Sequence, residues 1–342
     1  MPPFDSSRLR VGKLPADVLA RCLAKVPRDE RVVLGPALGE DVAAITFGDR
    51  LLLAKTDPIT FASDLIGWYA VNVNANDIAT AGARPAWFMA SALLPEGSSE
   101  AQAESLFDQI LSACDALGCK LVGGHTEITY GLARPIVVGC MLGELAPDRL
   151  ITTAGAQVGD EIVMAKPIAI EGTALLAREA PERLRAAGVS SDLITRCRDL
   201  LFDPGISVVK EALAAASAAR VHSMHDPTES GLATALREVA TAAGVGVEIE
   251  AERLLILDET REICARLRLD PLGLIASGSL LITAAPSESS RVVEAVRAAG
   301  SPAGVIGRVV SASAGLRIVV EGKARDLPEF PRDELARLLE SG

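Results

Sequence analysis

Four acidic segments between residues 39 and 127 stand at the ends of apolar runs and carry side chains suited to metal binding. Their acids are Asp41 in Gly39–Ala43, Asp57 in Lys55–Pro58, Asp77 in Asn76–Ala79 and Glu127 in Gly123–Glu127. Burying a carboxylate is costly unless a cation or hydrogen bonds compensate, and oxygen ligands suit hard cations such as Mg²⁺. The pattern therefore predicts hard-cation and polyphosphate chemistry, with a nucleotide–magnesium site as the first hypothesis.

The segment 64–81 must position Asp77 together with the neighbouring Asn76, and its composition is unusual for a helix. Asn72, Asn74, Asn76 and Asp77 occupy its interior, where such side chains compete with the helical hydrogen bonds. Either they project from one surface of a buried helix and serve the site, or they form an exposed polar stripe. The apolar residues among them favour burial and function.

Composition limits the classes of function. The chain has 342 residues, of which 49% are hydrophobic, enough for two packed domains. No apolar stretch approaches the ~20 residues of a membrane span, and the N-terminus lacks a signal-peptide pattern, so we expect a cytoplasmic protein. A formal charge of −11 argues against nucleic acid or membrane partners. An acidic protein that binds a polyphosphate needs cations to mediate the contact.

Alternating strand and helix patterns divide the chain at about residue 150, because the segment 146–156 is rich in turn formers. The predicted domains are 1–150 and 151–342, of the α/β or α+β class. The expected strands are 42–45, 51–55, 120–123, 136–141, 161–165, 246–250, 278–283 and 305–309. The expected helices are 64–81, 99–117, 207–219, 231–243 and 287–299, the second capped by Ser98 or Ser99 and stopped by Gly118.

Common nucleotide and metal motifs are missing from the sequence. It has neither a P-loop nor a Gly-x-Gly-x-x-Gly turn opening a helix, so ATP would require another architecture. The six cysteines form no Cys-x-x-Cys pair and are interpreted as reduced, mostly buried thiols. A complete structural zinc site cannot be written from their spacing.

Four longer motifs together resemble the aminoimidazole ribonucleotide (AIR) synthetase superfamily over nearly the whole chain. The segment 39–45 (GEDVAAI) resembles its Gly-Asp-Asp-Ala-Ala-Val type motif, and 73–83 (VNANDIATAGA) resembles its Val-Asn-Asp-Leu-Ala type. The segment 123–127 (GGHTE) resembles the family's Gly-Gly-Asp/Glu/His-Thr turn, and 226–233 (DPTESGLA) the helix start of its second domain. The resemblance implies an ATP-dependent homodimer whose N-terminal sheets pair between subunits, followed by a C-terminal α+β domain.

The same resemblance implies roles for individual residues. The implied Mg²⁺ ligands are Asp41, Asp57, Asp77, Glu127 and Asp226. The implied nucleotide contacts are Asp41, Lys55, Thr56, Asn76, Asp77, Gly123, Gly124, His125 and Thr126, with Lys55 and His125 as catalytic candidates. Structural alternatives remain open. Asp41 and Asp57 also suit turns, Asp226 suits a helix cap, Lys55 suits a strand end, and the turn at His125 could serve only to position backbone amides.

Within the superfamily the chain is most similar to the HypE-like branch, through Gly12–Pro15 and Trp68–Asn74. HypE-type dehydratases end in a cysteine, whereas this sequence ends Leu-Leu-Glu-Ser-Gly. The resemblance implies an ATP- and Mg²⁺-dependent enzyme that transfers the γ-phosphoryl group to a carbonyl, amide or phosphorylated small molecule. The alternatives are an ATP-binding maturation factor that acts on a partner protein, and a kinase similar to thiamine-monophosphate kinase.

Overall fold

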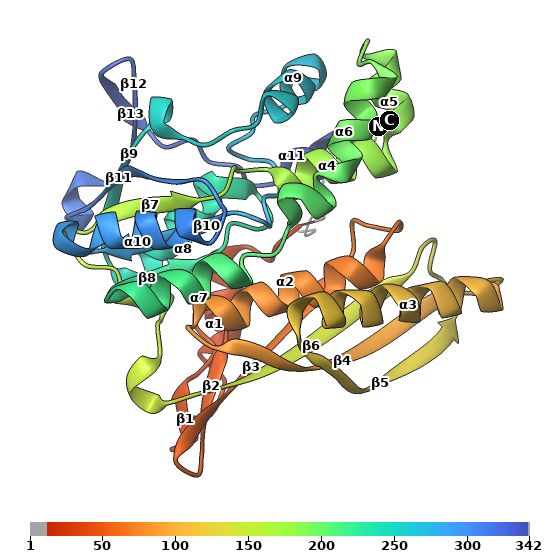
Figure 1. The fold of residues 1–342 in the computed structure, drawn as a ribbon, viewed down its shortest axis with the longest axis horizontal. Helices are drawn as coiled ribbons and strands as arrows, with labels where there is room; N and C mark the ends of the chain where they lie inside the picture. The colour runs from red at the N-terminus through yellow and green to blue at the C-terminus, as the bar shows by residue number, and fades with distance from the viewer. Residues whose placement is uncertain (1–11, 341–342) are drawn as a thin grey trace.

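The computed structural model describes residues 12–340, which form two mixed α/β domains, each built on one sheet (Figure 1). The first sheet has the order β1-β2-β3-β6-β4-β5, and its only parallel pair in the described chain is β4 with β5. The elements of the first domain are α1 (Ala16–Leu23), β1 (Val32–Leu34), β2 (Ala43–Phe47), β3 (Arg50–Ile59), α2 (Ile66–Thr80), β4 (Arg84–Pro95), α3 (Glu100–Leu117), β5 (Lys120–Thr129) and β6 (Ile136–Leu145).

Helices α2 and α3 run along one face of this sheet (Figure 1). Every residue of α2 except Trp68 is buried, including Asn72, Asn74, Asn76 and Asp77. The alternative of an exposed polar stripe is therefore wrong, since α2 lies between the first sheet and the second domain. The close packing of α2 on the sheet requires glycine at position 139 of β6, because a Cβ there would lie 2.3 Å from Nδ2 of Asn74.

Helix α3 has the ends predicted from the sequence. The hydroxyl of Ser99 accepts a hydrogen bond from the N–H of Gln102, whose side chain accepts one from the N–H of Ser99. This capping box satisfies two N–H groups that helical bonding leaves free. Gly118 ends the helix at a φ of 71°, in the left-handed region that glycine enters without steric cost.

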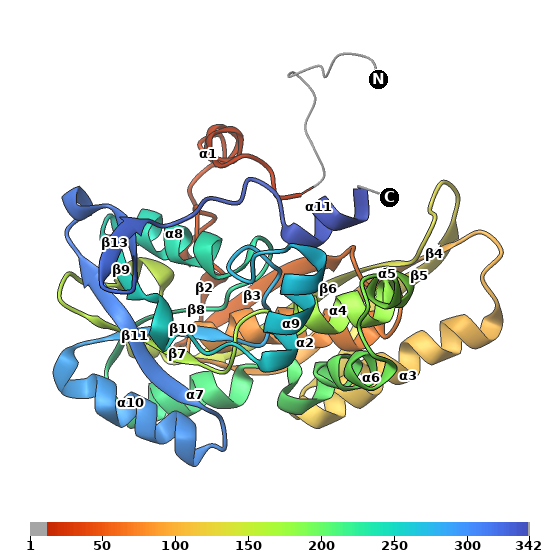
Figure 2. The same cartoon turned by 90° about the horizontal axis from the view of Figure 1, so that it is seen from above.

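The second sheet has the order β13-β12-β9-β11-β7-β10-β8, with β12 and β9 as its only parallel pair among the described strands. Helices α4, α5 and α6 lie together in both views (Figures 1 and 2). The elements are β7 (Glu161–Ala165), α4 (Ile170–Glu179), α5 (Pro181–Ala186), α6 (Ser191–Asp199), α7 (Val209–Ala218), β8 (Val221–His225), α8 (Gly231–Ala243), β9 (Gly246–Glu250), α9 (Asp258–Leu267), β10 (Leu280–Ala284), α10 (Pro286–Ala298), β11 (Ala303–Val310), β12 (Leu316–Val320), β13 (Lys323–Asp326) and α11 (Glu334–Glu340).

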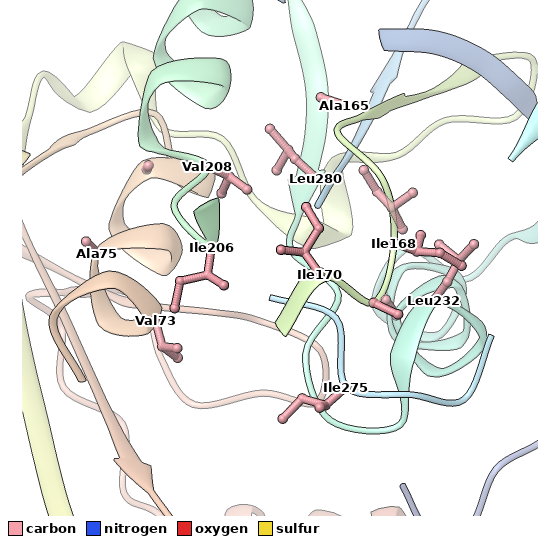
Figure 3. Packing of buried hydrophobic residues seen from close by; sticks show 14 of the residues in the cluster. Val73, Ala75, Ala165, Ile168, Ile170, Ile206, Val208, Leu232, Ile275 and Leu280 are labelled. Atoms are coloured by element: carbon pink, nitrogen blue, oxygen red, sulfur yellow. The ribbon is translucent and has the colours of Figure 1, made fainter. Parts of the chain in front are cut away.

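The two domains share a continuous hydrophobic core. Figure 3 shows Val73 of α2 on the side of the helix that faces Ile206, which precedes α7. The Asn76 amide supports this packing, because its Oδ1 accepts a hydrogen bond from the N–H of Val208 at 2.8 Å and its Nδ2 donates to the carbonyl of Ile206 at 2.9 Å. The interface that carries α2 is therefore both apolar and hydrogen-bonded.

The two-domain fold expected from the sequence is confirmed, whereas sheet pairing between subunits stays a prediction, as does a boundary at residue 150. The expected helix over 64–81 begins later, at Ile66. The helices and strands expected above do not include several observed elements, namely β1, β4, β8, β12, β13, α1, α4, α5, α6, α9 and α11. In the described residues no helix is both long and apolar enough to cross a membrane. The six cysteines are free thiols, and only Cys22 is exposed.

Candidate metal and nucleotide site

Three carboxylates from separate parts of the chain meet at the domain interface. Asp41 lies just before β2, Asp77 lies in α2 and Asp226 directly follows β8. One oxygen from each lies within 4.8 Å of the others. The buried Oδ2 of Asp77 and both carboxylate oxygens of Asp226 have no hydrogen-bond partner. Buried polar atoms normally have partners, so these free oxygens fit a hard cation such as Mg²⁺.

The electrostatics of this group favour a cation as well. Burial raises the pKa of Asp77 well above its usual range, although the Lys55 ammonium opposes the effect. Burial also raises the pKa of Asp226 to about 7, and the neighbouring Asp41 carboxylate adds to the shift. Like charges in a poorly solvated site disfavour ionisation, whereas a bound cation would favour the ionised forms.

Lys55 of β3 places an ammonium group beside these carboxylates. Its Nζ lies 3.3 Å from a carboxylate oxygen of Asp57 and 3.3 Å from one of Asp77. Burial alone would lower the pKa of Lys55, but these two carboxylates outweigh it and raise the pKa above its usual value. Lys55 is therefore a fixed positive charge in the site.

A chain of charged side chains supports Asp41 from behind. The Nδ1 of His225 lies 2.9 Å from Oδ2 of Asp41, and its Nε2 lies 3.0 Å from Oε2 of Glu238 in α8. The other oxygen of Glu238 accepts a hydrogen bond from Lys13 at 2.8 Å. Burial would lower the pKa of His225, but the two carboxylates raise it well above its usual value. An imidazolium at this position orients Asp41 and offsets part of its charge.

Comparisons with known proteins agree with the geometry. Residues 39–145 match the family model described as AIR synthase related protein, N-terminal domain, and residues 157–319 match the corresponding C-terminal domain. The carbamoyl dehydratase HypE of Rhodobacter capsulatus is 30% identical over 313 residues, which cover 89% of this chain and 88% of the relative. The chain belongs to the AIR synthase-related family. It falls in the HypE-like branch.

Solved structures share the fold of this AIR synthase-related chain. HypE in a HypE–HypF complex has a TM-score of 0.73 at 22% identity, over 92% of this chain and 99% of that one. HypE in complex with ATP has a TM-score of 0.68 at 21% identity, over 92% and 91% of the two chains. Thiamine monophosphate kinase from Aquifex aeolicus has a TM-score of 0.67 at 19% identity, over 91% and 97%.

Several residues of the family motifs make hydrogen bonds that fix the backbone near the site. The hydroxyl of Thr56 donates to the carbonyl of Gly139 at 2.7 Å, within the sheet. Asn74 fixes the backbone of Asp57 by accepting from its N–H at 2.8 Å and donating to its carbonyl at 3.3 Å. Asn76 bonds across the domain interface, as described above. The family motif therefore shapes the wall of the site as well as supplying acids.

The Gly-Gly-His-Thr-Glu segment lies on another part of the same sheet. Asp57 pairs with Gly139, Gly139 with Ala90 and Ala90 with Gly124, so two strands separate Asp57 from β5. Three strand spacings amount to roughly 14 Å. Gly123, Gly124, His125, Thr126 and Glu127 are all exposed on β5. A single chain therefore does not bring this segment to the three carboxylates, and Nε2 of His125 instead lies 3.3 Å from Oε2 of Glu127.

Asp226 is not a helix cap. Ser230 precedes α8 in the N-cap position, with a φ of 62°, and both oxygens of Asp226 lack hydrogen bonds. The N–H of Ser230 instead donates to the carboxylate of Asp333, which also accepts from the N–H of Leu335 and so joins the start of α11 to this loop.

Sequence reasoning missed His225 and Glu238, which support Asp41, and it missed Asp333 and Glu40, which accept hydrogen bonds from backbone near the site. The carboxylate of Glu40 accepts hydrogen bonds from the N–H groups of Thr153 and Ala154 at 3.1 and 2.9 Å. The only available signals were the presence of Glu40 inside the first motif and of His225 directly before Asp226. The sequence around Glu40 and His225 did not predict their partners Thr153 and Asp41, which lie more than 100 residues away in the chain.

Proposed function

We propose that this protein is an ATP- and Mg²⁺-dependent enzyme that transfers the γ-phosphoryl group of ATP to a carbonyl, amide or phosphorylated small molecule. The observation that carries the proposal is the convergence of Asp41, Asp77 and Asp226, with three unpartnered buried oxygens, beside the ammonium of Lys55. Membership of the AIR synthase-related family, in which a relative of similar fold is a HypE bound to ATP, supports the nucleotide.

In this proposal Asp41, Asp77 and Asp226 hold Mg²⁺, and Asp57 completes the acidic rim beside Lys55. When bound, Mg²⁺ supplies neutralisation of charge on the transferring phosphoryl group. Lys55 provides a fixed point charge for a phosphate oxygen. His225 holds Asp41 in place, and the backbone hydrogen bonds of Asn74 hold Asp57. These residues contribute to catalysis mainly by positioning the reacting groups, because phosphoryl transfer requires no covalent protein nucleophile.

A homodimer would give the β5 segment a role in this site. Strand β5 is the open edge of the first sheet in the described chain, and the large apolar side chains of Val122, Ile128 and Tyr130 are exposed on it or directly after it. Phe107 and Leu111 of α3 are exposed as well. A second copy that covers this edge would bury the apolar groups and carry His125 and Glu127 toward a nucleotide at the dimer interface.

Two alternatives differ in the acceptor. The HypE–HypF complex supports a maturation partner protein as the acceptor, in which case turnover requires that partner. The similarity to thiamine monophosphate kinase supports a small phosphorylated acceptor. ATP hydrolysis measured with small molecules and with copurifying proteins separates these cases.

The first test is thermal unfolding of the native chain and of Asp77→Asn with a non-hydrolysable ATP analogue, with Mg²⁺ and with chelator. At a hundredfold excess over Kd, ligand binding adds about 2.7 kcal/mol, which amounts to a shift of several degrees for domains of this size. We expect the shift to require Mg²⁺ and to disappear in Asp77→Asn.

The matched control is Asp49→Asn, an identical change at an exposed position in the turn between β2 and β3. This variant should retain the full shift. Absence of a shift in the native chain under every condition would refute the ATP-dependent function.

A further inference from the structure

A cavity of about 450 Å³ opens between the domains beside Asp57. The first domain contributes apolar side chains from the end of β3 and the segment after it, and α2 contributes Val73. The second domain contributes side chains from α4 and from the loops near residues 228 and 276. The lining includes Ile59, Phe61, Glu171, Leu175, Glu229 and Ser277.

The deep wall of this cavity holds polar groups that the protein leaves unsatisfied. Ser277 is 1% exposed, and its hydroxyl faces the carboxylate of Glu171 without a hydrogen bond of regular geometry. Its backbone N–H donates to Oε2 of Glu171 at 3.2 Å, and Glu171 is itself only 4% exposed. The buried Oε1 of Glu229 also lacks a partner. An unpaired buried polar atom is unfavourable, so a ligand that bonds to these groups gains free energy.

The charge of the wall indicates the ligand's chemistry. Glu171 and Glu229 offer acceptor oxygens. The ammonium of Lys13 at the cavity edge bonds to Glu238 and also offsets part of the charge of Glu229, so Glu171 is the carboxylate without a cationic partner in the lining. Arg134, the other basic group in the lining, is exposed. Burial raises the pKa of Glu171 to about 7, and a cationic nitrogen beside it would favour the carboxylate.

We propose that this cavity binds the acceptor substrate, and that the acceptor is a small molecule with an amine or amidine nitrogen. The nitrogen bonds to Glu171, Ser277 and Glu229, while an apolar body packs against Ile59, Phe61 and Leu175. Asp57 of the proposed phosphoryl-transfer site lines this cavity. The assignment of the ligand as the acceptor therefore rests on the proposed function. Recognition of the nitrogen rests only on the cavity wall.

The test measures binding of benzylamine, benzyl alcohol and benzoate to the full chain by ligand-observed NMR. These probes share one ring and differ in the polar group. We expect the dissociation constant of benzylamine to be at least about tenfold lower than that of benzyl alcohol, equivalent to about 1.4 kcal/mol, with benzoate the weakest. Glu171→Gln should abolish the preference, and the matched change Glu294→Gln at an exposed site in α10 should keep it.

Ser277→Ala provides a second variant should Glu171→Gln unfold. It should weaken benzylamine binding by about threefold, as expected for one lost hydrogen bond. Equal binding of all three probes, or a preference unchanged in both variants, overturns this proposal even if the Mg²⁺-dependent nucleotide shift is present. A lost nucleotide shift with an intact amine preference instead refutes the phosphoryl-transfer function and leaves an amine-binding cavity.

Discussion

Replacement of Asp226 by asparagine should stabilise the metal-free protein at alkaline pH. Burial and the neighbouring Asp41 carboxylate raise the pKa of Asp226 to about 7, compared with 3.8 for a free side chain. A carboxyl whose pKa is raised on folding contributes stability that is fully present below pH 4 and is lost as the pH rises through 7. Above pH 7 the native protein therefore carries the full cost of a buried negative charge.

The magnitude follows from the shift in pKa. A change of about three units corresponds to about 4 kcal/mol, an upper limit for the gain on removing the charge. Because neither oxygen of Asp226 has a partner, the introduced amide is also unpartnered, at a cost of about 1–3 kcal/mol. The net gain at pH 8 should be about 2 kcal/mol, equivalent to roughly 4–8 °C in Tm.

The assay is thermal unfolding of the native chain and Asp226→Asn at pH 5 and pH 8 in chelator, repeated with Mg²⁺ and an ATP analogue. In chelator the variant should have a higher Tm than the native chain at pH 8, and the difference should be smaller at pH 5. The variant should also lack the stabilisation that Mg²⁺ and the nucleotide analogue give the native chain. Asp49→Asn should match the native chain throughout. A variant less stable than the native chain at pH 8 in chelator would contradict the role of charge burial.

Three further changes test the supports of the site. Glu238→Gln should lower the free energy of unfolding by about 3 kcal/mol at pH 7, because the carboxylate's pKa falls to about 2 on folding. In urea unfolding, the difference between variant and native chain should vanish as the pH falls from about 4.5 to 2. Equal stability of the two proteins at pH 7 would refute this prediction. Asn76→Ala should lower the free energy of unfolding by about 2–4 kcal/mol, because it leaves two buried backbone groups unpaired. The loss should exceed that of Asn72→Ala, which removes a single hydrogen bond within α2. Equal losses of stability in urea unfolding would contradict the interdomain role of Asn76. Gly124→Ala should destabilise the β4–β5 pair, because a Cβ would lie 2.2 Å from the carbonyl oxygen of Ala90, and unchanged hydrogen exchange in β5 would refute this.

The sequence predicted the elements that carry strong local signals. Helix α3 has a capping serine and a terminal glycine, and both were predicted. By contrast, α4 begins after Ala169, which has a φ of 57° and no capping side chain, so its start had no local signal. Strand β4 is bounded by prolines at positions 85 and 95, residues that more often mark turns than a central strand.

The candidate acids could be located by motif, because each stands beside apolar residues in a recognisable local pattern. Their partners could not. His225 contacts an acid 184 positions earlier in the chain, and such a contact depends on how β8 and the first domain pack. The unpaired hydroxyl of Ser277 likewise becomes evident only when the burial around it is known. Local pattern therefore predicts which residue types are available, while tertiary packing determines their charge and geometry.

The location of the acids has a consequence for how the domains hold together. Asp41 and Asp77 belong to the first domain and Asp226 to the second, so a cation bound by all three bridges the interface. Without it, repulsion among these carboxylates opposes the apolar contacts and the Asn76 hydrogen bonds that join the domains. Lys55 compensates only part of that repulsion, because it is one positive charge against several negative ones. Mg²⁺ should therefore strengthen the interface more than either domain's own core, and removal of Mg²⁺ should first increase hydrogen exchange in α2 and the segment around residue 206.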